Sequence, residues 1–478
     1  MRTPQQFLDS LKDGREVFYR GKKVDDVATH RVIGVAARHA AKLFEMERGF
    51  RSEELGEEVS QYFRFPRGAT DLMSRHRLVY DTTMRCNGVF NISQAIGSDA
   101  LFALTIVSKK VDGSSGTDYS RRVGDYYRHV ATKDLTLAVA QTDAKGDRGK
   151  KPHEQADRDV YVHVDEVTDD GIVVSGAKAH TTQGAVSDEI IVIPTRNMTE
   201  KDADFALAFA VPSNAKGLKI IVRPIDELEG NTSNVLSGKD FELETLTIFD
   251  RVKVPRERVF MQGDHAFAGA LAVTFATYHR FTAVSYRAAT SNLFVGATSL
   301  AAKANGVQSA PHVRDDLQLV IMYKELMRMS AIAAAHSCVD EGGIAVPNPL
   351  YTNIGKLYSN QNFGRVVEAL VDTAGGIIST MPAQEDMENA DERAYITKYM
   401  AGATDGDSRL QVMKMTKELA ASSLTGYLLT LMIHAEGSAQ ASKLALVRDY
   451  DLGEAEALVE GILGREGRAG TTFRRPSP

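Results

Sequence analysis

One run of the sequence, FATYHRFTAVSYRAAT at 275–290, places ionisable side chains in a segment that is otherwise apolar and rich in alanine. Its spacing predicts a helix in which His279 and Tyr286 lie two turns apart on one face, with Arg280 beside the histidine. A histidine in such a helix can be a core residue, a metal ligand or a catalytic base. The run alone favours a core residue, but a buried guanidinium needs an acceptor, so Arg280 strengthens the case for a functional site.

Two further segments could contact a ligand. AVAQTDAKGDRGKKP at 138–152 offers hydrogen-bonding side chains, cations, and a glycine that allows close approach to the backbone. SGAKAHTTQGAVSD at 175–188 offers an imidazole and hydroxyl groups among small residues, which suits a planar polar ligand. From composition alone, each is explained at least as well by a turn that satisfies its own backbone. The candidate residues in these segments are Gln141, Thr142, Asp143, Lys145, Gly146, Asp147, Arg148, His180, Thr181 and Thr182.

A pair of glycines, Gly375 and Gly376, interrupts the helical pattern of VVEALVDTAGGIISTMP at 366–382. Adjacent glycines destabilise a helix interior, so this pair either ends a helix or admits a ligand close to the backbone. Both interpretations stay open from the sequence alone.

The elements that must position these residues fall into three zones. Helical spacing dominates residues 1–137, and short β-branched runs with period two follow over 138–262. Helical spacing returns in long segments over 263–464, which predicts an up-and-down bundle. Residues 465–478 are expected to form a tail that is disordered or clasps a partner. The order of these zones predicts an α+β protein, because a doubly wound nucleotide-binding fold would alternate strands with helices.

Composition narrows the function classes. The 478 residues are 43% hydrophobic and 25% charged, with a net charge of −6, and no block of lysine and arginine resembles a nucleic-acid footprint. No signal-peptide apolar region and no run of about 18 apolar residues occurs, so we expect neither export nor a membrane span. Two cysteines far apart in sequence are typical of a reduced, cytoplasmic setting. Neither a dinucleotide-binding glycine fingerprint nor a P-loop is present.

Seven strings in order resemble the flavin family that joins 4-hydroxyphenylacetate 3-hydroxylases with 4-hydroxybutyryl-CoA dehydratases. They are FLDSLKDGREVFYRGKKVDDVATH, TDAKGDRGKKP, DGIVVSGAKAHTTQGA, FALAFAVPSNAKGLKIIVRP, FDRVKVPRERVF, YHRFTAVSYR and DTAGGIISTMP. The resemblance implies an acyl-CoA-dehydrogenase-like fold: an N-terminal helical domain, a central antiparallel β domain and a C-terminal four-helix bundle, assembled as a homotetramer. It also implies FAD between the β domain and the bundle, which makes the residues at 141–148 and 180–182, with the glycine pair, candidates for binding FAD.

The two branches of this family imply different chemistry. The dehydratase branch adds a [4Fe–4S] cluster, whose histidine ligand matches His279. The positions that match its cysteine ligands hold Asn91, Ala95 and Tyr286, and two cysteines cannot supply three thiolates. We therefore expect FAD without an iron–sulfur cluster and without any metal.

The hydroxylase branch uses O₂ and reduced FAD that a separate NAD(P)H:flavin reductase supplies. Its phenol-binding residues have no counterpart near Ser93–Gly97, and its pocket histidine aligns with Val139, so we expect a small substrate other than 4-hydroxyphenylacetate. The leading hypothesis is the oxygenase component of a two-component monooxygenase, with His279, Arg280 and Tyr286 at the catalytic site. A redox-neutral FAD enzyme acting on an acyl-CoA-type thioester, such as a double-bond isomerase, and a catalytically silent relative are the alternatives.

Overall fold

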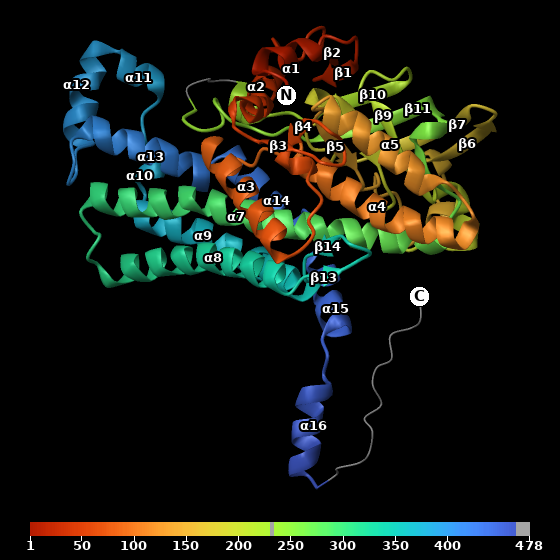
Figure 1. Ribbon diagram of the computed structural model, residues 1–478. Helices are drawn as coiled ribbons and strands as arrows, with labels where there is room; N and C mark the ends of the chain where they lie inside the picture. Colours follow the sequence, from red (N-terminus) through yellow and green to blue (C-terminus); the bar gives the residue numbers. More distant parts are fainter. Residues whose placement is uncertain (230–233, 465–478) are drawn as a thin grey trace.

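Two sheets form the centre of the computed structural model, which describes residues 1–229 and 234–464 (Figure 1). A six-stranded sheet has the order β2-β1-β10-β11-β7-β6, and a four-stranded sheet has the order β12-β9-β8-β5. The strands are β1 (Glu16–Tyr19), β2 (Lys22–Lys23), β5 (Leu137–Ala140), β6 (His163–Thr168), β7 (Gly171–Lys178), β8 (Glu189–Val192), β9 (Leu207–Pro212), β10 (Leu218–Val222), β11 (Thr245–Pro255) and β12 (Val259–Gln262).

The sheets differ from the expected antiparallel β domain in two ways. β1 and β2 come from the segment expected to be helical, and β1 pairs with β10 in parallel. β5 and β8 also pair in parallel, while the remaining strand pairs are antiparallel. The alternation in EVFY is only four residues long, too short to outweigh the helical pattern that surrounds it, and strand direction depends on contacts that sequence periodicity does not report.

The N-terminal helices lie along one side of the sheets and of the bundle, where α3 packs against α7 and α8 (Figure 1). They are α1 (Pro4–Ser10), α2 (Ile33–Ala41), α3 (Ala69–Arg85), α4 (Ala95–Ser115) and α5 (Tyr119–Thr132), with a small hairpin of β3 (Gly49–Arg51) and β4 (Glu58–Ser60) between them. α4 is buried over most of its length, as its almost continuous apolar sequence predicts. A Cβ atom on Gly97 would lie 2.2 Å from the Leu137 Cβ, so this glycine lets α4 pack against the start of β5.

Long helices form the bundle. α7 (His265–Asn305) runs along its whole length, and α8 (Pro311–His336), α9 (Pro349–Ala374) and α13 (Gly406–Ala420) pack around it. The shorter elements that follow or connect these helices are α6 (Asp226–Glu229), β13 (Val339–Asp340), β14 (Ala345–Val346), α10 (Ile377–Thr380), α11 (Gln384–Glu388), α12 (Ala390–Tyr399) and α14 (Ser423–His434). The chain leaves the β sheets at Gln262 and enters the bundle at His265, close to the expected boundary.

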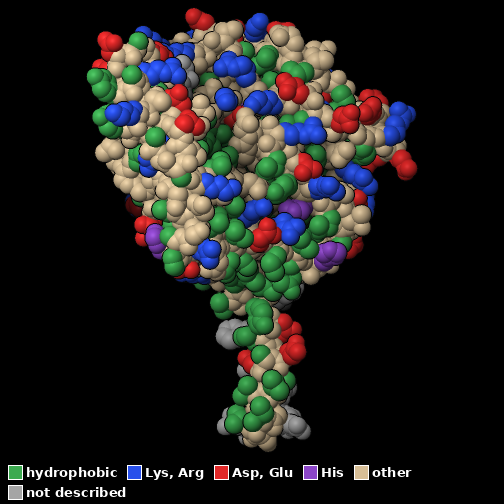
Figure 2. Space-filling model, turned by 90° about the vertical axis from the view of Figure 1, so that its left-hand side faces the viewer, with side chains coloured by type: hydrophobic (Ala, Val, Ile, Leu, Met, Phe, Trp, Pro, Cys, Tyr) green, Lys and Arg blue, Asp and Glu red, His purple; other side chains and the backbone are tan. Residues whose placement is uncertain are grey.

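The last two helices form an arm. α15 (Ala439–Asp449) packs on α9, and α16 (Gly453–Ile462) projects away from the body (Figure 1). Figure 2 shows hydrophobic side chains gathered where the arm leaves the body, and more of them along the arm. The tail expected over 465–478 lies outside the described residues. Among the helices that are described, none is long and apolar enough to cross a membrane.

Candidate active site

His279 lies on the face of α7 that meets α4. Its Nδ1 is 3.5 Å from Oδ2 of Asp99, and neither of these atoms has a hydrogen-bond partner in the described chain. The imidazole stacks on Phe275 and is 12% exposed. A histidine beside a fixed carboxylate is the arrangement that orients an imidazole for proton transfer.

Asp99 is held in place by two donors. Its Oδ1 accepts hydrogen bonds from Arg75 Nη2 at 2.6 Å and from Thr282 Oγ1 at 3.1 Å. Thr282 lies one turn after His279 on α7, so the same helix face that presents the histidine also fixes its carboxylate partner. Asp99 is the one charged residue in the first fourteen residues of α4, and this contrast in the sequence could have identified it.

A second carboxylate, Glu436, contacts α7 two turns further on. Its Oε1 accepts a hydrogen bond from Tyr286 at 2.8 Å, and its Oε2 accepts one from Arg287 Nη2 at 2.5 Å. Tyr286 also stacks on Phe90, with ring centroids 4.4 Å apart. Burial by itself would raise the pKa of Glu436, but the charges of Arg287, His279 and Lys356 hold it below the usual value. Glu436 therefore supplies a second negative charge near His279.

Four side chains from α7 and α9 hold the turn that carries Glu436. They donate hydrogen bonds to backbone carbonyls at the end of α14 and in the turn after it. These bonds join Arg287 to Met432, Asn360 to Ile433, Arg280 to Glu436, and Lys356 to Gly437. The last carbonyls of a helix lack partners within the helix and favour cations nearby, so this set caps α14 from outside.

Arg280 therefore has a structural task. Its Nε donates to the Glu436 carbonyl at 3.0 Å and its Nη1 to Asn353 Oδ1 at 2.9 Å. A Cβ atom on Gly437 would lie 2.9 Å from Arg280 Nη2, so glycine leaves room for the guanidinium at this turn. Arg280 and Tyr286 both support Glu436, a residue that the sequence analysis did not select.

Lys356 adds an unusual ammonium group to this cluster. Burial, helped by the positive charges of Arg287 and Arg280, lowers the pKa of Lys356 to about 7, although Glu436 opposes the shift. The lysine sits on α9 and is fully buried. The candidate site thus contains an amine that can gain or lose a proton near neutral pH.

The polar segments of the β domain come together through Lys178, at the end of β7. Its Nζ donates to the carbonyls of Gln141 and Ile193 and to Oδ1 of Asp143, the last at 2.6 Å. The Thr142 carbonyl accepts a hydrogen bond from the Ala179 N–H, so the segments at 141–148 and 180–182 lie side by side. Lys145 and His180 both have φ in the left-handed region, at 82° and 55°.

A positive charge on α14 also affects the pKa values in these loops. Burial lowers the pKa of His180, and the positive charges of Lys145 and His434 lower it further. Burial also lowers the pKa of Lys145, with Arg148 adding to the effect. Asp147 and Arg148, in the first of the two segments, are exposed to solvent. The two segments thus form one polar surface at the contact between the β domain and the bundle.

Two atoms of this surface fit a bound polar group. Asp143 Oδ2 and Thr181 Oγ1 are buried, and neither has a hydrogen-bond partner in the described chain. Unpaired buried polar atoms are costly, so such atoms mark places where a ligand can bind. A flavin carries N–H and hydroxyl groups that can pair with a carboxylate oxygen and a hydroxyl, and this donor set therefore fits FAD.

Replacement of Thr181 by valine is expected to change stability and cofactor affinity in opposite directions. The free energy of unfolding of the cofactor-free protein should rise by about 1 kcal/mol, because an unpaired hydroxyl is removed. The dissociation constant for FAD should rise by about tenfold, because a hydrogen bond is lost. Denaturant unfolding and fluorescence titration with FAD measure these effects.

Ser213→Ala is the matched control, because Ser213 Oγ is also buried without a partner. That variant should gain stability and keep its FAD affinity. Unchanged FAD affinity in Thr181→Val would remove Thr181 from the cofactor site.

Two further glutamates connect the β-domain loops with Glu436. Glu244 accepts hydrogen bonds from Thr182 Oγ1 at 3.1 Å and from the Tyr427 hydroxyl of α14 at 3.2 Å. Burial, together with the charges of Glu244 and Glu436, raises the pKa of Glu242 well above its usual value. The three carboxyls therefore share one neighbourhood. The Glu-x-Glu spacing in FELET could have indicated that both side chains share a face.

Burial also raises the pKa of Glu244 to about 7, against the hydrogen bonds from Thr182 and Tyr427 that favour the ionised form. Because the folded pKa lies above the unfolded one, Glu244 contributes stability below about pH 4.5 that is lost as the pH rises to about 7. The glutamine variant should lack this loss, which amounts to about 3 kcal/mol. Thermal unfolding between pH 5 and pH 8 should therefore show a shallower decline for Glu244→Gln than for the unchanged protein.

Replacement of the exposed Glu257 by glutamine should leave the pH dependence unchanged. If the Glu244→Gln curve runs parallel to that of the unchanged protein, Glu244 does not titrate in this range.

The glycine pair lies elsewhere in this chain. Gly375 ends α9 with φ at 69°, and Gly376 begins α10, at the end of the bundle remote from the β sheets (Figure 1). Both glycines are exposed, and a Cβ atom on either would meet no other atom within 4 Å. α9 thus carries both glycines away from the β domain and from the other FAD-binding candidates of the same chain, and their role in binding FAD stays a prediction.

One group of side chains within the described part of the chain has metal-ligand atoms close together: His39, Cys86 and Asp240. His39 Nδ1 lies 2.9 Å from Asp240 Oδ1, and Nε2 lies 2.9 Å from the Phe90 carbonyl oxygen. Asp240 also accepts hydrogen bonds from Lys42, and burial raises the pKa of the Cys86 thiol to about 12. These atoms are already paired or protonated, so the group is a buried hydrogen-bond network.

The fold consists of a helical layer, paired sheets and a bundle, with a polar surface between the β domain and the bundle. This is the acyl-CoA-dehydrogenase-like fold of flavoproteins that the sequence predicts. Models of the 4-hydroxyphenylacetate 3-hydroxylase family match residues 3–261 with its N-terminal part and residues 268–464 with its C-terminal part. The chain belongs to this family, which confirms the resemblance seen in the sequence.

Relatives come from both branches. The chain is 28% identical to the 4-hydroxybutyryl-CoA dehydratase/vinylacetyl-CoA-Δ-isomerase of Clostridium aminobutyricum, over 97% of this chain and 99% of that protein. It is 25% identical to the 4-hydroxyphenylacetate 3-monooxygenase oxygenase component of a Geobacillus strain, over 88% of each. Among solved structures, an archaeal 4-hydroxybutyryl-CoA dehydratase from N. maritimus matches with a TM-score of 0.92 and 26% identity, over 97% of this chain and 95% of that one.

The oxygenase component of 4-hydroxyphenylacetate 3-monooxygenase, solved with FAD and 4-hydroxyphenylacetate, matches with a TM-score of 0.90 and 24% identity, over 97% of this chain and 98% of that one. These likenesses confirm the predicted fold class.

Proposed function

We propose that the protein is the oxygenase component of a two-component monooxygenase, which uses FAD reduced by a separate NAD(P)H:flavin reductase to hydroxylate a small organic molecule. The observation that carries this proposal is the position of His279, whose Nδ1 lies 3.5 Å from Asp99 and whose neighbour Glu436 also acts on Glu242 of the β-domain loops. Relatives named as oxygenase components, and one solved with FAD, support the same reading.

The residues proposed to hold FAD are those of the segments at 141–148 and 180–182, with Asp143 and Thr181 as the unpaired buried groups. Bound reduced FAD would supply the electrons that activate O₂. Around it, the protein excludes water with the apolar faces of α4 and α7 and presents polar groups at fixed positions.

His279 is proposed to accept or deliver a proton at Nδ1 or Nε2 and to orient the substrate. Asp99 places a carboxylate 3.5 Å from the imidazole Nδ1, and Glu436 places a second negative charge nearby. Tyr286 and Arg280 act on the site by holding Glu436 and its turn. The substrate is proposed to be a small molecule, aromatic or not, other than 4-hydroxyphenylacetate.

Oxygen-18 labelling tests the proposal. The full-length protein is combined with FAD, a flavin reductase and NADH under ¹⁸O₂, with a panel of small phenols and non-aromatic acids. A product heavier by one ¹⁸O atom, formed only when this protein is present, is the expected result. Oxidation of NADH without labelled product from any member of the panel would contradict the proposal.

The absence of an iron–sulfur cluster is part of the proposal and rests on the donor set. Tyr286 and Asn91 are engaged in hydrogen bonds, to Glu436 and to the His39 carbonyl. Of the two cysteines in the sequence, Cys86 is a buried thiol whose pKa is raised, and Cys338 follows α8. Iron and sulfide analysis of protein purified without oxygen checks this point.

A second candidate function is a redox-neutral FAD enzyme that acts on an acyl-CoA-type thioester. The likeness to the clostridial and archaeal dehydratases over nearly the whole chain favours it, as does the histidine at position 279. Anaerobic conversion of a β,γ-unsaturated acyl-CoA by the protein with oxidised FAD would support this function, and conversion of none would count against it.

The protein is also proposed to be a cytoplasmic homotetramer without nucleic-acid or membrane partners. Support for assembly comes from α16, where Leu458, Val459 and Ile462 are all more than half exposed. An isolated apolar helix is stabilised when another copy covers it. In such an assembly, Gly375 and Gly376 would contact the FAD of a neighbouring copy.

A further inference from the structure

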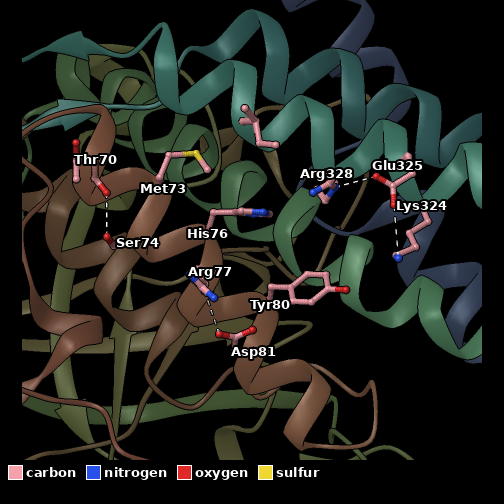
Figure 3. Close-up of a pocket in the computed structure, with 11 residues that line it drawn as sticks. Thr70, Met73, Ser74, His76, Arg77, Tyr80, Asp81, Lys324, Glu325 and Arg328 are labelled. Atoms are coloured by element: carbon pink, nitrogen blue, oxygen red, sulfur yellow. Dashed lines mark hydrogen bonds and ion pairs between the residues drawn. The ribbon is translucent and has the colours of Figure 1, made fainter.

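A cleft of about 730 Å³ lies between α3 and α8 (Figure 3), apart from the residues assigned to the candidate active site. α3 supplies His76 and Arg77 to its wall, and α8 supplies Lys324 and Arg328. Apolar side chains, among them Met73 and Ile332, complete the lining. The cleft therefore combines positive charge with an apolar surface.

His76 presents a hydrogen-bond acceptor to this cleft. Its Nδ1 lies 2.8 Å from Ser285 Oγ, and that hydroxyl donates its one hydrogen to the Phe281 carbonyl at 2.8 Å. When Ser285 donates to Phe281 it accepts from His76, an arrangement that places the hydrogen of the imidazole on Nδ1 and a lone pair on Nε2. Although His76 is only 7% exposed, its Nε2 has no hydrogen-bond partner in the described chain, and the ring points from α3 towards Arg328 (Figure 3).

The imidazole stays neutral in the working range of pH. Burial, together with the positive charge of Arg328, lowers the pKa of His76 to about 4. With the hydrogen on Nδ1, Nε2 is an acceptor at neutral pH and can pair with a hydroxyl or N–H group of a ligand.

Positive charge in the cleft exceeds the negative charge that neutralises it. Glu325 faces both Arg328, at 2.8 Å, and Lys324, at 3.5 Å, and Asp81 faces Arg77 at 3.7 Å. Three cations thus share two carboxylates. Only Nε of Arg328 is used in its bond to Glu325, so the Nη1 and Nη2 groups are available to an oxyanion.

We propose that the α3–α8 cleft is a binding site for a small hydroxycarboxylate. The carboxylate accepts hydrogen bonds from Nη1 and Nη2 of Arg328, the hydroxyl donates to Nε2 of His76, and the apolar part of the ligand packs against Met73 and Ile332. This site is separate from the proposed oxygenase chemistry and does not depend on it.

Methyl NMR of the full-length protein with ¹³C-labelled methionine tests the site, because Met73 lines the cleft. The probe is 2-hydroxy-4-methylpentanoate, and its partner without the hydroxyl is 4-methylpentanoate. The hydroxy acid should shift the Met73 signal in a saturable way. Loss of the hydroxyl should raise the dissociation constant by about tenfold, and Arg328→Gln should raise it by at least about tenfold.

Arg328 is exposed, so its replacement leaves the fold intact, whereas replacement of the buried His76 carries more risk. Arg365→Gln, an exposed arginine on α9, is the matched control and should bind the probe as the unchanged protein does. The proposal is overturned if Met73 does not respond, if both acids bind equally, or if Arg328→Gln binds as tightly as the unchanged protein. A shift at Met432, beside Glu436, without a shift at Met73 would place binding in the candidate active site and also overturn it.

Discussion

Replacement of His279 by alanine is expected to lower turnover by about 10²- to 10⁴-fold while the protein stays folded, which is the usual contribution of a general acid or base. The side chain is 12% exposed, and its Nδ1 has no hydrogen-bond partner. Asp99 Oδ2, the nearest acceptor, also has none, so removal of the imidazole breaks no hydrogen bond between the two residues. Turnover is measured as incorporation of ¹⁸O into product, with FAD affinity and thermal unfolding measured on the same preparation.

His336→Ala is the matched control, because His336 is exposed at the end of α8. It should keep full turnover. If His279→Ala instead loses stability while its folded fraction turns over normally, His279 is a core residue and the catalytic role is wrong.

Replacement of Glu436 by alanine is expected to lower the free energy of unfolding by about 3–5 kcal/mol, the cost of leaving a buried charge without its partner. Arg287 would be that charge, since its side chain is fully buried and its Nη2 donates to Glu436 Oε2. Tyr286 would lose its acceptor at the same time. Thermal and denaturant unfolding of the cofactor-free protein measure the change.

A double variant separates the ion pair from the rest of the turn. Glu436→Leu combined with Arg287→Met removes both charges, and a buried ion pair replaced by apolar residues often costs little. The double variant should therefore unfold at a higher temperature than Glu436→Ala. Equal loss in both would show that the carbonyl bonds of the turn, rather than the ion pair, dominate its stability.

The sequence revealed the parts of the site that are local. His279, the two polar segments and the long helices follow from short runs whose composition and spacing are informative by themselves. The partners of these residues depend on distant segments: Tyr286 and Glu436 are 150 residues apart, and Lys178 gathers groups on three strands or loops. Periodicity identifies an element but does not say which elements meet.

The same limit explains the errors in the fold. β1 joins β10, which lies roughly two hundred residues later in the chain, and its four residues carry too little pattern to indicate that pairing. The glycine pair shows the opposite case: the sequence left open a helix end or a ligand contact, and the structure has a helix end whose distance from the other candidates follows from the length of α9.

The turn after α14 determines how far the chain can be shortened from its C-terminus without loss of the Glu436 site. Four carbonyls between Met432 and Gly437 accept hydrogen bonds from side chains of α7 and α9, and Glu436 lies in this range. A chain that stops just after Ser438 would keep the carboxylate and all four of its supports, and it would lose only the arm. A chain that stops before Met432 would leave Arg280, Arg287 and Lys356 facing one another without the acceptors that now separate them.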